Sequence, residues 1–256
     1  MEDKNRFSGF ANLYDEGRPK LPKKVFDILK KYYRNNISLI VDIGCGTGNS
    51  SEICEDYADK VIGIDPSKDM INIAKKKANS KLMFKEGRGD DTGLDSNIAD
   101  VVICSQAFHW MEPTSTINEV CRILKDAGVF AVVDIDTFPV INLELEKYNS
   151  ELQEMVQELD IKQDLTIYPT KDHLDNLKKS NRFSYCKEIS FENEILYDRE
   201  TFKKYFMSKG GIQNAIKSNY EPVISKLKDL DSLLDDVFQN RTLTAWFSCK
   251  IKLGIK

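Results

Sequence analysis

The chain has few of the residues that build metal sites. Its 256 residues include only two histidines, His109 and His173, and its six cysteines are scattered without a Cys-x-x-Cys pair. Zinc sites need closely spaced cysteines and histidines, so we expect no bound metal. The cysteines are expected to be free thiols, mostly buried, as in a reducing compartment.

Long apolar runs and an excess of positive charge are also missing. The longest apolar stretches, such as VFAVV at 129–133, are far too short to cross a bilayer, and the first ten residues lack the apolar centre of a signal peptide. Lys and Arg number 37 against 41 Asp and Glu, so the net charge of −4 gives no global field that attracts nucleic acid. We expect a cytoplasmic protein, a monomer or a homodimer, whose partner is a small molecule rather than a membrane or a nucleic acid.

Apolar runs alternate with helical patterns through the first half of the chain. The run at 38–44 is continuous and β-rich, which is typical of a strand buried on both faces of a parallel sheet. Such alternation predicts βαβ units and an α/β fold. The expected strands are 38–44, 60–65, 81–87, 98–106 and 129–136. Helices are expected from Leu21, from Ser50 or Ser51 as the capping residue, from Pro66 in a first turn, and from 114 to a C-cap at Gly128.

The rhythm changes after residue 137. A long amphipathic helix is expected over 143–160, and no repeat or low-complexity linker separates the halves. The second half therefore reads as helices and strands added to the same sheet. The further expected elements are helices within 170–180, 199–218 and 221–239 and strands at 184–196 and 242–253.

Three alternating glycines follow the first strand, in Gly44-Cys45-Gly46-Thr47-Gly48. A triphosphate-binding P-loop would need a lysine after its last glycine, and none follows Gly48. A dinucleotide fingerprint would place its third glycine at position 49, which is Asn49, so a nicotinamide-dependent oxidoreductase is disfavoured. The loop is expected to hold a smaller ligand without a pyrophosphate, whose amino acid end meets the acid Asp42.

A second acid, Asp65, ends the next expected strand. At the carboxyl end of a strand in an open α/β sheet, such an acid accepts hydrogen bonds from the two ribose hydroxyls of a nucleotide. The loop and Asp65 therefore predict a ligand that contains a ribose.

These segments resemble the class I S-adenosylmethionine-dependent methyltransferases. VDIGCGTGNSS is similar to their first motif and VIGIDPSKDMI to their second. FKEGRGDDTGLDSNIADVVICSQAFHW resembles the third region of a subgroup, methyltransferase type 11-like, that acts on small molecules. FSGFANLYDEGRPKLP resembles the N-terminal segment of the same subgroup. The resemblance extends over about 7–136.

The resemblance implies S-adenosyl-L-methionine as cofactor, with S-adenosyl-L-homocysteine as its product. It implies that Asp42 faces the loop amides and the cofactor ammonium, that Asp65 binds the ribose and that Met70 lies against the adenine. Arg88 stands where many relatives have an Asp that receives the adenine amino group, so that bond is expected from Asp90 or the nearby backbone. The implied cofactor residues are Tyr14, Arg18, Asp42, Gly44, Cys45, Gly46, Thr47, Gly48, Asp65, Pro66, Met70, Arg88, Gly89, Asp90, Ser105, Gln106 and Ala107.

Three further residues receive roles on the same ground. Tyr14 and Arg18 are expected in an N-terminal lid, with Arg18 as the partner of the cofactor carboxylate. His109 is the candidate catalytic residue, which would orient an acceptor or take its proton.

The fold expected from this resemblance is a Rossmann-like, doubly wound α/β domain over 1–256, with a mostly parallel seven-stranded sheet and a helical cap. Its parts are an N-terminal lid and helix over 1–36, a cofactor-binding core over 37–136, a cap and substrate region over 137–220, and a final helix and strand over 221–256.

The acceptor of the methyl group is the most open part of the prediction. The [DN]-P-P-[YF] tetrapeptide of base methylation is absent after the fourth expected strand, which together with the acidic charge disfavours nucleic acid. A small molecule methylated on a carboxylate or a hydroxyl is favoured, roofed by aromatic residues of the cap, where Lys203, Lys204 and Lys209 could meet an acidic acceptor. The alternatives are a non-catalytic cofactor-binding regulatory protein and a nucleic-acid methyltransferase.

Overall fold

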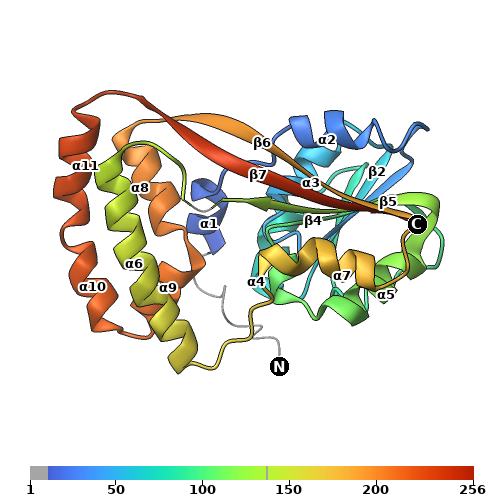
Figure 1. The fold of residues 1–256 in the computed structure, drawn as a ribbon. Coiled ribbons are helices and arrows are strands. Elements are labelled where there is room, and N and C mark those ends of the chain that lie inside the picture. The colour runs from blue at the N-terminus through green and yellow to red at the C-terminus, as the bar shows by residue number, and fades with distance from the viewer. Residues whose placement is uncertain (1–10, 137) are drawn as a thin grey trace.

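The computed structural model describes residues 11–136 and 138–256. Its centre is a seven-stranded sheet in the order β3-β2-β1-β4-β5-β7-β6 (Figure 1). β1 to β5 are parallel, whereas β7 runs antiparallel to both β5 and β6. The expected fold class, a mostly parallel seven-stranded sheet, is confirmed. The strands are β1 (Leu39–Ile43), β2 (Lys60–Asp65), β3 (Leu82–Glu86), β4 (Ala99–Ser105), β5 (Leu124–Ile135), β6 (Tyr185–Tyr197) and β7 (Leu243–Ile255).

Helices cover both faces of the parallel strands. Alternate residues of each strand enter different apolar clusters, because side chains along a strand point to opposite faces. One cluster joins Ile40 and Val101 to helices α2 and α3, and the other joins Val41 and Val102 to α5 and α7. The covering elements are α2 (Lys24–Leu29), α3 (Asn49–Cys54), α4 (Lys68–Ala74), η1 (Lys75–Lys77), α5 (Pro113–Ile123) and α7 (His173–Lys179).

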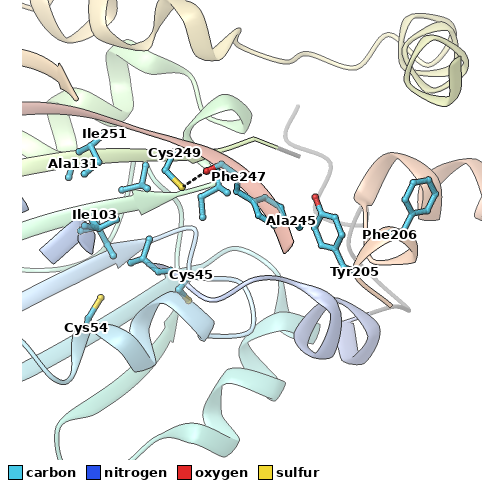
Figure 2. Packing of buried hydrophobic residues seen from close by; sticks show 14 of the residues in the cluster. Cys45, Cys54, Ile103, Ala131, Tyr205, Phe206, Ala245, Phe247, Cys249 and Ile251 are labelled. Atoms are coloured by element: carbon cyan, nitrogen blue, oxygen red, sulfur yellow. Dashed lines mark hydrogen bonds between the residues drawn. The ribbon is translucent and has the colours of Figure 1, made fainter. Parts of the chain in front are cut away.

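A second group of helices lies beyond the end of the sheet toward which β5 points (Figure 1). Its core is aromatic: Phe202, Tyr205 and Phe206 are buried, and the ring of Tyr205 meets that of Phe247 on β7 at 5.5 Å (Figure 2). Of residues 138–220, α6, α8 and α9 join this group, whereas α7 and β6 pack with the sheet. The group comprises α6 (Leu143–Lys162), α8 (Arg199–Met207), α9 (Gly210–Lys217), α10 (Glu221–Leu227) and α11 (Leu230–Phe238).

The antiparallel pair β6–β7 connects these two parts. Residues of β7 from Cys249 to Ile255 pair with β5, and the earlier residues of β7 extend past the end of β5 while still paired with β6. Directly after β6, Asp198 caps α8 through a reciprocal hydrogen bond pair with Thr201. The helical group is therefore attached to the sheet by a continuous two-stranded ribbon.

Several element boundaries differ from the sequence expectation. Helix α3 has Gly48 as its N-cap, because the hydroxyls of Ser50 and Ser51 are used inside the fold instead. Helix α4 is capped by Ser67, so Pro66 precedes the helix rather than occupying its first turn. Gly128 is not a C-cap: α5 ends at Ile123, and the chain enters β5 at once because Ile123 and Leu124 are both buried. The helix expected over 221–239 is two helices, α10 and α11.

No helix within 11–136 or 138–256 combines the length and the apolar composition needed to span a bilayer.

Candidate functional site

The glycine loop joins β1 to α3 at the carboxyl edge of the sheet. A Cβ on Gly44 would lie 2.4 Å from Cβ of Ala107, and a Cβ on Gly48 would lie 2.6 Å from the Phe84 ring. All three glycines have positive φ values, +74°, +55° and +86°, which favour glycine, but Gly46 has the most space, since the atom nearest to its Cβ would be in the Tyr14 ring at 3.8 Å. Side chains at Gly44 and Gly48 would therefore clash with their neighbours. Gly46 leaves an open space above the loop, the Gly46 cradle.

Asp42 is a fully buried carboxylate below this loop. Its Oδ2 accepts hydrogen bonds from the hydroxyls of Ser50 and Ser51, both at 2.6 Å. Burial raises the pKa of Asp42 to about 6; the two serine hydroxyls oppose the rise and the nearby Asp65 carboxylate adds to it. Among the described residues its Oδ1 has no hydrogen-bond partner. A buried oxygen in that state fits a cationic ligand group.

Asp65 ends β2 beside the loop. Its Oδ2 accepts from the Gly46 N–H at 3.0 Å, and its Oδ1 accepts from the Ser67 N–H at 2.8 Å. Asp65 therefore holds the loop amide that the sequence assigns to Asp42. Asp42 thus binds the start of α3, whereas Asp65 binds the glycine loop.

An N-terminal helix, α1 (Ala11–Gly17), lies over the loop. The Tyr14 ring lies beside Gly46, and the Arg18 guanidinium stacks over that ring at 5.0 Å. The Nε of Arg18 is buried, and no hydrogen-bond partner for it occurs within the described chain. Tyr14 and Arg18 thus both lie at the loop, and their roles in a lid over the cofactor carboxylate stay predictions. Residues 7–10 of the resembling segment lie outside the described residues.

Helix α1 is tied to both parts of the molecule. Toward the core, Lys77 Nζ lies 2.6 Å from Asp15 Oδ1 and 2.6 Å from Asn49 Oδ1. The Asn49 amide in turn donates to the Asp15 carbonyl at 3.1 Å. Toward the helical group, Glu16 pairs with Lys204 of α8 at 3.3 Å. Helix α1 therefore connects the core of the sheet with the helical group above the glycine loop.

Beneath α1 is a cavity of about 60 Å³. Small-molecule sites usually enclose roughly 300 Å³ or more, so α1 occupies space that a nucleotide-sized ligand would need. Eight of the sequence-predicted residues line it: Tyr14, Arg18, Gly44, Cys45, Gly46, Thr47, Ser105 and Gln106. The sequence reasoning missed Pro19, Leu21, Asn49, Ser50 and Ile135. Asn49 and Ser50 continue the first motif, and Ile135 ends a parallel strand. Both their place in the motif and their place at a strand end could have been read from the sequence.

A larger groove of about 470 Å³ lies on the other side of Arg18 and Pro19. It runs between the segment at 16–22 and the start of α8, and it is open to solvent. Its walls include Lys20, Asn193, Tyr197, Thr201 and Lys204.

Gln106 follows β4 in a strained backbone conformation, with φ of +54°. Its amide donates to the Ile135 carbonyl at 2.6 Å, and its Oε1 accepts from the Ile135 N–H at 3.1 Å. The side chain thereby joins the ends of β4 and β5. Gln106 lines the cavity, as expected, but its polar atoms serve this junction.

His109 lies in a short 3-10 turn, η2 (Phe108–Trp110). Its ring contacts Trp110 with a centroid distance of 4.6 Å, and its carbonyl accepts from the Tyr168 N–H at 2.8 Å. His109 is outside the described linings of both cavities, and Ala107 is outside the smaller one. Its catalytic role stays a prediction.

The adenine residues expected from the third motif form a separate turn. Arg88 makes a two-point ion pair with Asp90, at 2.8 and 3.0 Å, which helps to lower the pKa of Asp90. Gly89 has no space for a side chain, because a Cβ would lie 2.7 Å from Sδ of Met111. Met70 is buried on α4. In the described structure these residues and Pro66 lie outside the lining of the small cavity, and their contacts with adenine stay predictions.

Comparison with known proteins finds similarity to methyltransferases. Residues 41–132 match the family model described as a methyltransferase domain. This segment runs from β1 into β5 and contains the glycine loop, Asp65 and Gln106. Over these residues the chain is similar to a methyltransferase domain, in agreement with the resemblance found in the sequence.

Two relatives illustrate the match. The chain is 35% identical over 124 residues to the "Probable S-adenosylmethionine-dependent methyltransferase CRG1" of Saccharomyces cerevisiae, covering 46% of this chain and 43% of that protein. It is 28% identical over 127 residues to the uncharacterized methyltransferase Rv3342 of Mycobacterium tuberculosis, covering 50% and 51%. The alignments span about half the length of these relatives.

Solved structures share the fold over most of the chain. A protein from Anaeromyxobacter dehalogenans, described as a candidate type II methyltransferase, is 20% identical with a TM-score of 0.64, covering 93% of this chain and 97% of that one. Phosphoethanolamine N-methyltransferase 2 of Haemonchus contortus, in complex with phosphomonomethylethanolamine and S-adenosylhomocysteine, is 14% identical with a TM-score of 0.58, covering 98% and 59%. At this identity the likeness establishes the fold.

Proposed function

We propose that this protein is an S-adenosylmethionine-dependent methyltransferase that acts on a small molecule. The observation that carries the proposal is the joint placement of the Gly44–Gly48 loop, Asp42 and Asp65 at adjacent strand ends within a methyltransferase domain. The relatives named for this chemistry support the cofactor.

Three buried polar atoms lie near the loop without partners, and two of them suit charged groups of that cofactor. Within the described residues, Asp42 Oδ1, Thr47 Oγ1 and Arg18 Nε are buried without hydrogen-bond partners. Asp42 would hold an ammonium group and Arg18 a carboxylate, and Asp65 would accept from ribose hydroxyls. The Gly46 cradle would allow the ligand to approach the backbone.

When bound, the cofactor supplies a methyl group already activated by a sulfonium centre. The work left to the protein is to hold the acceptor in line and to exclude water, because such a displacement depends mainly on proximity and orientation. A carboxylate acceptor needs no general base, whereas a hydroxyl acceptor needs a group such as His109 to take its proton.

The small-molecule part of the proposal is supported by charge and architecture. The net charge is −4, and helices α6 and α8–α11 stand beyond the carboxyl edge of the sheet, where they can roof an acceptor. A cytoplasmic location and a monomeric or homodimeric state belong to the same proposal, and they rest on the composition alone.

Calorimetry tests the cofactor assignment. Wild-type protein should bind S-adenosylhomocysteine and give no response to NAD(H). Asp65→Ala should lose about 1–3 kcal/mol of this binding free energy, because buried hydroxyl partners are lost. Asp69→Ala, an exposed acid in the first turn of α4, is the matched control and should bind normally. Unchanged affinity in Asp65→Ala would contradict the ribose assignment, and binding of NAD alone would overturn the cofactor.

A turnover screen separates an enzyme from a regulatory binding protein. A broad metabolite panel with S-adenosylmethionine should yield S-adenosylhomocysteine for at least one acceptor. Tight cofactor binding without turnover of any acceptor would favour the non-catalytic alternative.

A further inference from the structure

Lys209 is a buried lysine at the junction of α8 and α9. Only 7% of its surface is exposed, and its Nζ lies over the rings of Phe138 at 4.3 Å, Phe206 at 4.5 Å and Tyr205 at 5.3 Å. Among the described residues its Nζ donates one long hydrogen bond, 3.4 Å to Asn149 Oδ1. In the described part of the chain no carboxylate lies within ion-pair distance of this ammonium.

The other buried lysine among the described residues shows what is unusual about this. Lys252 lies on β7 and forms an ion pair with Asp134 of β5 at 2.5 Å. Buried charges are normally paired in this way, because an isolated one costs several kcal/mol of solvation. Lys209 has aromatic faces in place of a counter-ion.

The charged groups around Lys209 point to the cofactor cleft. Burial lowers the pKa of Lys209 well below its ordinary value, the Arg18 guanidinium lowers it further, and Asp136 opposes both. Arg18 lines the small cavity, and Asp136 directly follows Ile135, which also lines it. Asp136 is exposed, and its Oδ1 accepts from the Phe138 N–H at 3.0 Å. Lys209 itself lies outside the lining of that cavity, and these two charged residues connect it with the site.

We propose that Lys209 anchors a carboxylate group of the methyl acceptor. The buried ammonium lacks the counter-ion that an acidic ligand would bring, and the rings of Phe138, Tyr205 and Phe206 offer an apolar wall to the body of such a ligand. This inference rests on the proposed function, since the ligand it describes is the acceptor of that reaction. Of the three cap lysines considered from the sequence, Lys203 and Lys204 are paired with acids on the surface, and Lys209 alone of these is buried.

The test compares acids with their uncharged amides. Calorimetry on the full chain saturated with S-adenosylhomocysteine would use benzoate and benzamide, hexanoate and hexanamide, and 3-phenylpropionate and 3-phenylpropionamide. At least one acid should bind tenfold or more tightly than its amide, and Lys209→Met should remove that preference. Lys228→Met, an exposed lysine after α10, should keep it.

The outcomes are distinct. If no acid is preferred in the wild type, or if the preference survives in Lys209→Met, the inference is wrong. If S-adenosylhomocysteine itself fails to bind, the proposed function fails first, and this is seen before any acid is added.

Thermal unfolding supplies a second readout. Methionine has nearly the shape of lysine and suits an aromatic surrounding, so Lys209→Met should unfold at the same temperature or higher. A clear fall in its Tm relative to wild type would show that Lys209 is a structural cation, and would overturn the assignment.

Discussion

At the scale of single residues, the site is organised by two acids with different neighbours. Asp42 is enclosed and bound by two serine hydroxyls, whereas Asp65 is bound by two backbone amides. Burial opposes the charged form of a carboxylate, which makes Asp42 sensitive to pH. The raised pKa of Asp42, about 6, places its response within reach of a binding experiment.

Binding of S-adenosylhomocysteine should therefore depend on pH through Asp42. The folded protein holds the Asp42 proton more tightly than an unfolded chain, so this group favours folding most at low pH, and the contribution is lost as pH rises from about 4 to about 6. A ligand ammonium favours the ionised form, so affinity should rise as pH rises to about 6 and then level off, being roughly tenfold weaker at pH 5 than at pH 7. Calorimetry between pH 5 and 8 measures it.

The control for this prediction is Asp42→Asn, which cannot ionise. Its affinity should be lower at pH 7 and nearly flat across the range. A wild-type affinity that does not change between pH 5 and 7 would contradict the placement of the ammonium at Asp42.

At the scale of elements, α1 decides access to the loop. It is held to the core by the Asp15, Asn49 and Lys77 cluster and to α8 by the Glu16–Lys204 pair. Lys77 and Asp15 are both largely shielded from solvent, so their pair should hold more firmly than an exposed one. Because Tyr14 of α1 lies beside Gly46, we expect α1 to move when the proposed cofactor enters.

Lys77→Met should therefore change rates more than affinity. Both association and dissociation of S-adenosylhomocysteine should speed up several-fold, because α1 moves away from the loop more often. Stopped-flow fluorescence measures both rates, with Lys76→Met, an exposed neighbour, as control. Wild-type rates in Lys77→Met would show that α1 does not limit access.

At the scale of the whole molecule, a buried polar network joins β5, β7 and α7. Asp134 Oδ2 meets Lys252 Nζ at 2.5 Å and His173 Nδ1 at 3.2 Å, and all three residues are buried. Burial raises the pKa of Asp134, but the His173 hydrogen bond and the Lys252 charge outweigh it and leave the pKa lowered. Its stabilising effect is present above the ordinary carboxyl pKa near 3.8 and is lost as pH falls below it.

Asp134→Asn should lower the free energy of unfolding by about 3–5 kcal/mol, because it leaves Lys252 buried without its counter-ion. Urea denaturation at pH 7 measures this effect. Asp126→Asn, a fully exposed position on the same strand, should change stability by less than about 0.5 kcal/mol. A small effect at Asp134 would show that the network tolerates an uncharged partner.

The sequence predicted much of this architecture and less of the site. The strands at 60–65 and 98–106 could be found because buried parallel strands are continuous apolar runs. The role of Gln106 could not, since its bond to Ile135 joins strand ends that are 29 residues apart. Lys209 is one lysine among several in a helical pattern, and only its position against the rings of Phe138 and Phe206 shows which of them is buried.

The β6–β7 ribbon limits which part of the protein can move to open the site. Its strands stay paired from Tyr185–Ile255 to Tyr197–Leu243, so the helical group cannot swing away from the sheet without breaking those pairings. Helix α1 is held by side chains and a few polar contacts, which break and re-form without cost to the sheet. Under the proposed function, the helical group would form a fixed roof over the acceptor and α1 would move to admit the cofactor, so that acceptor selectivity and the rate of cofactor exchange could change independently.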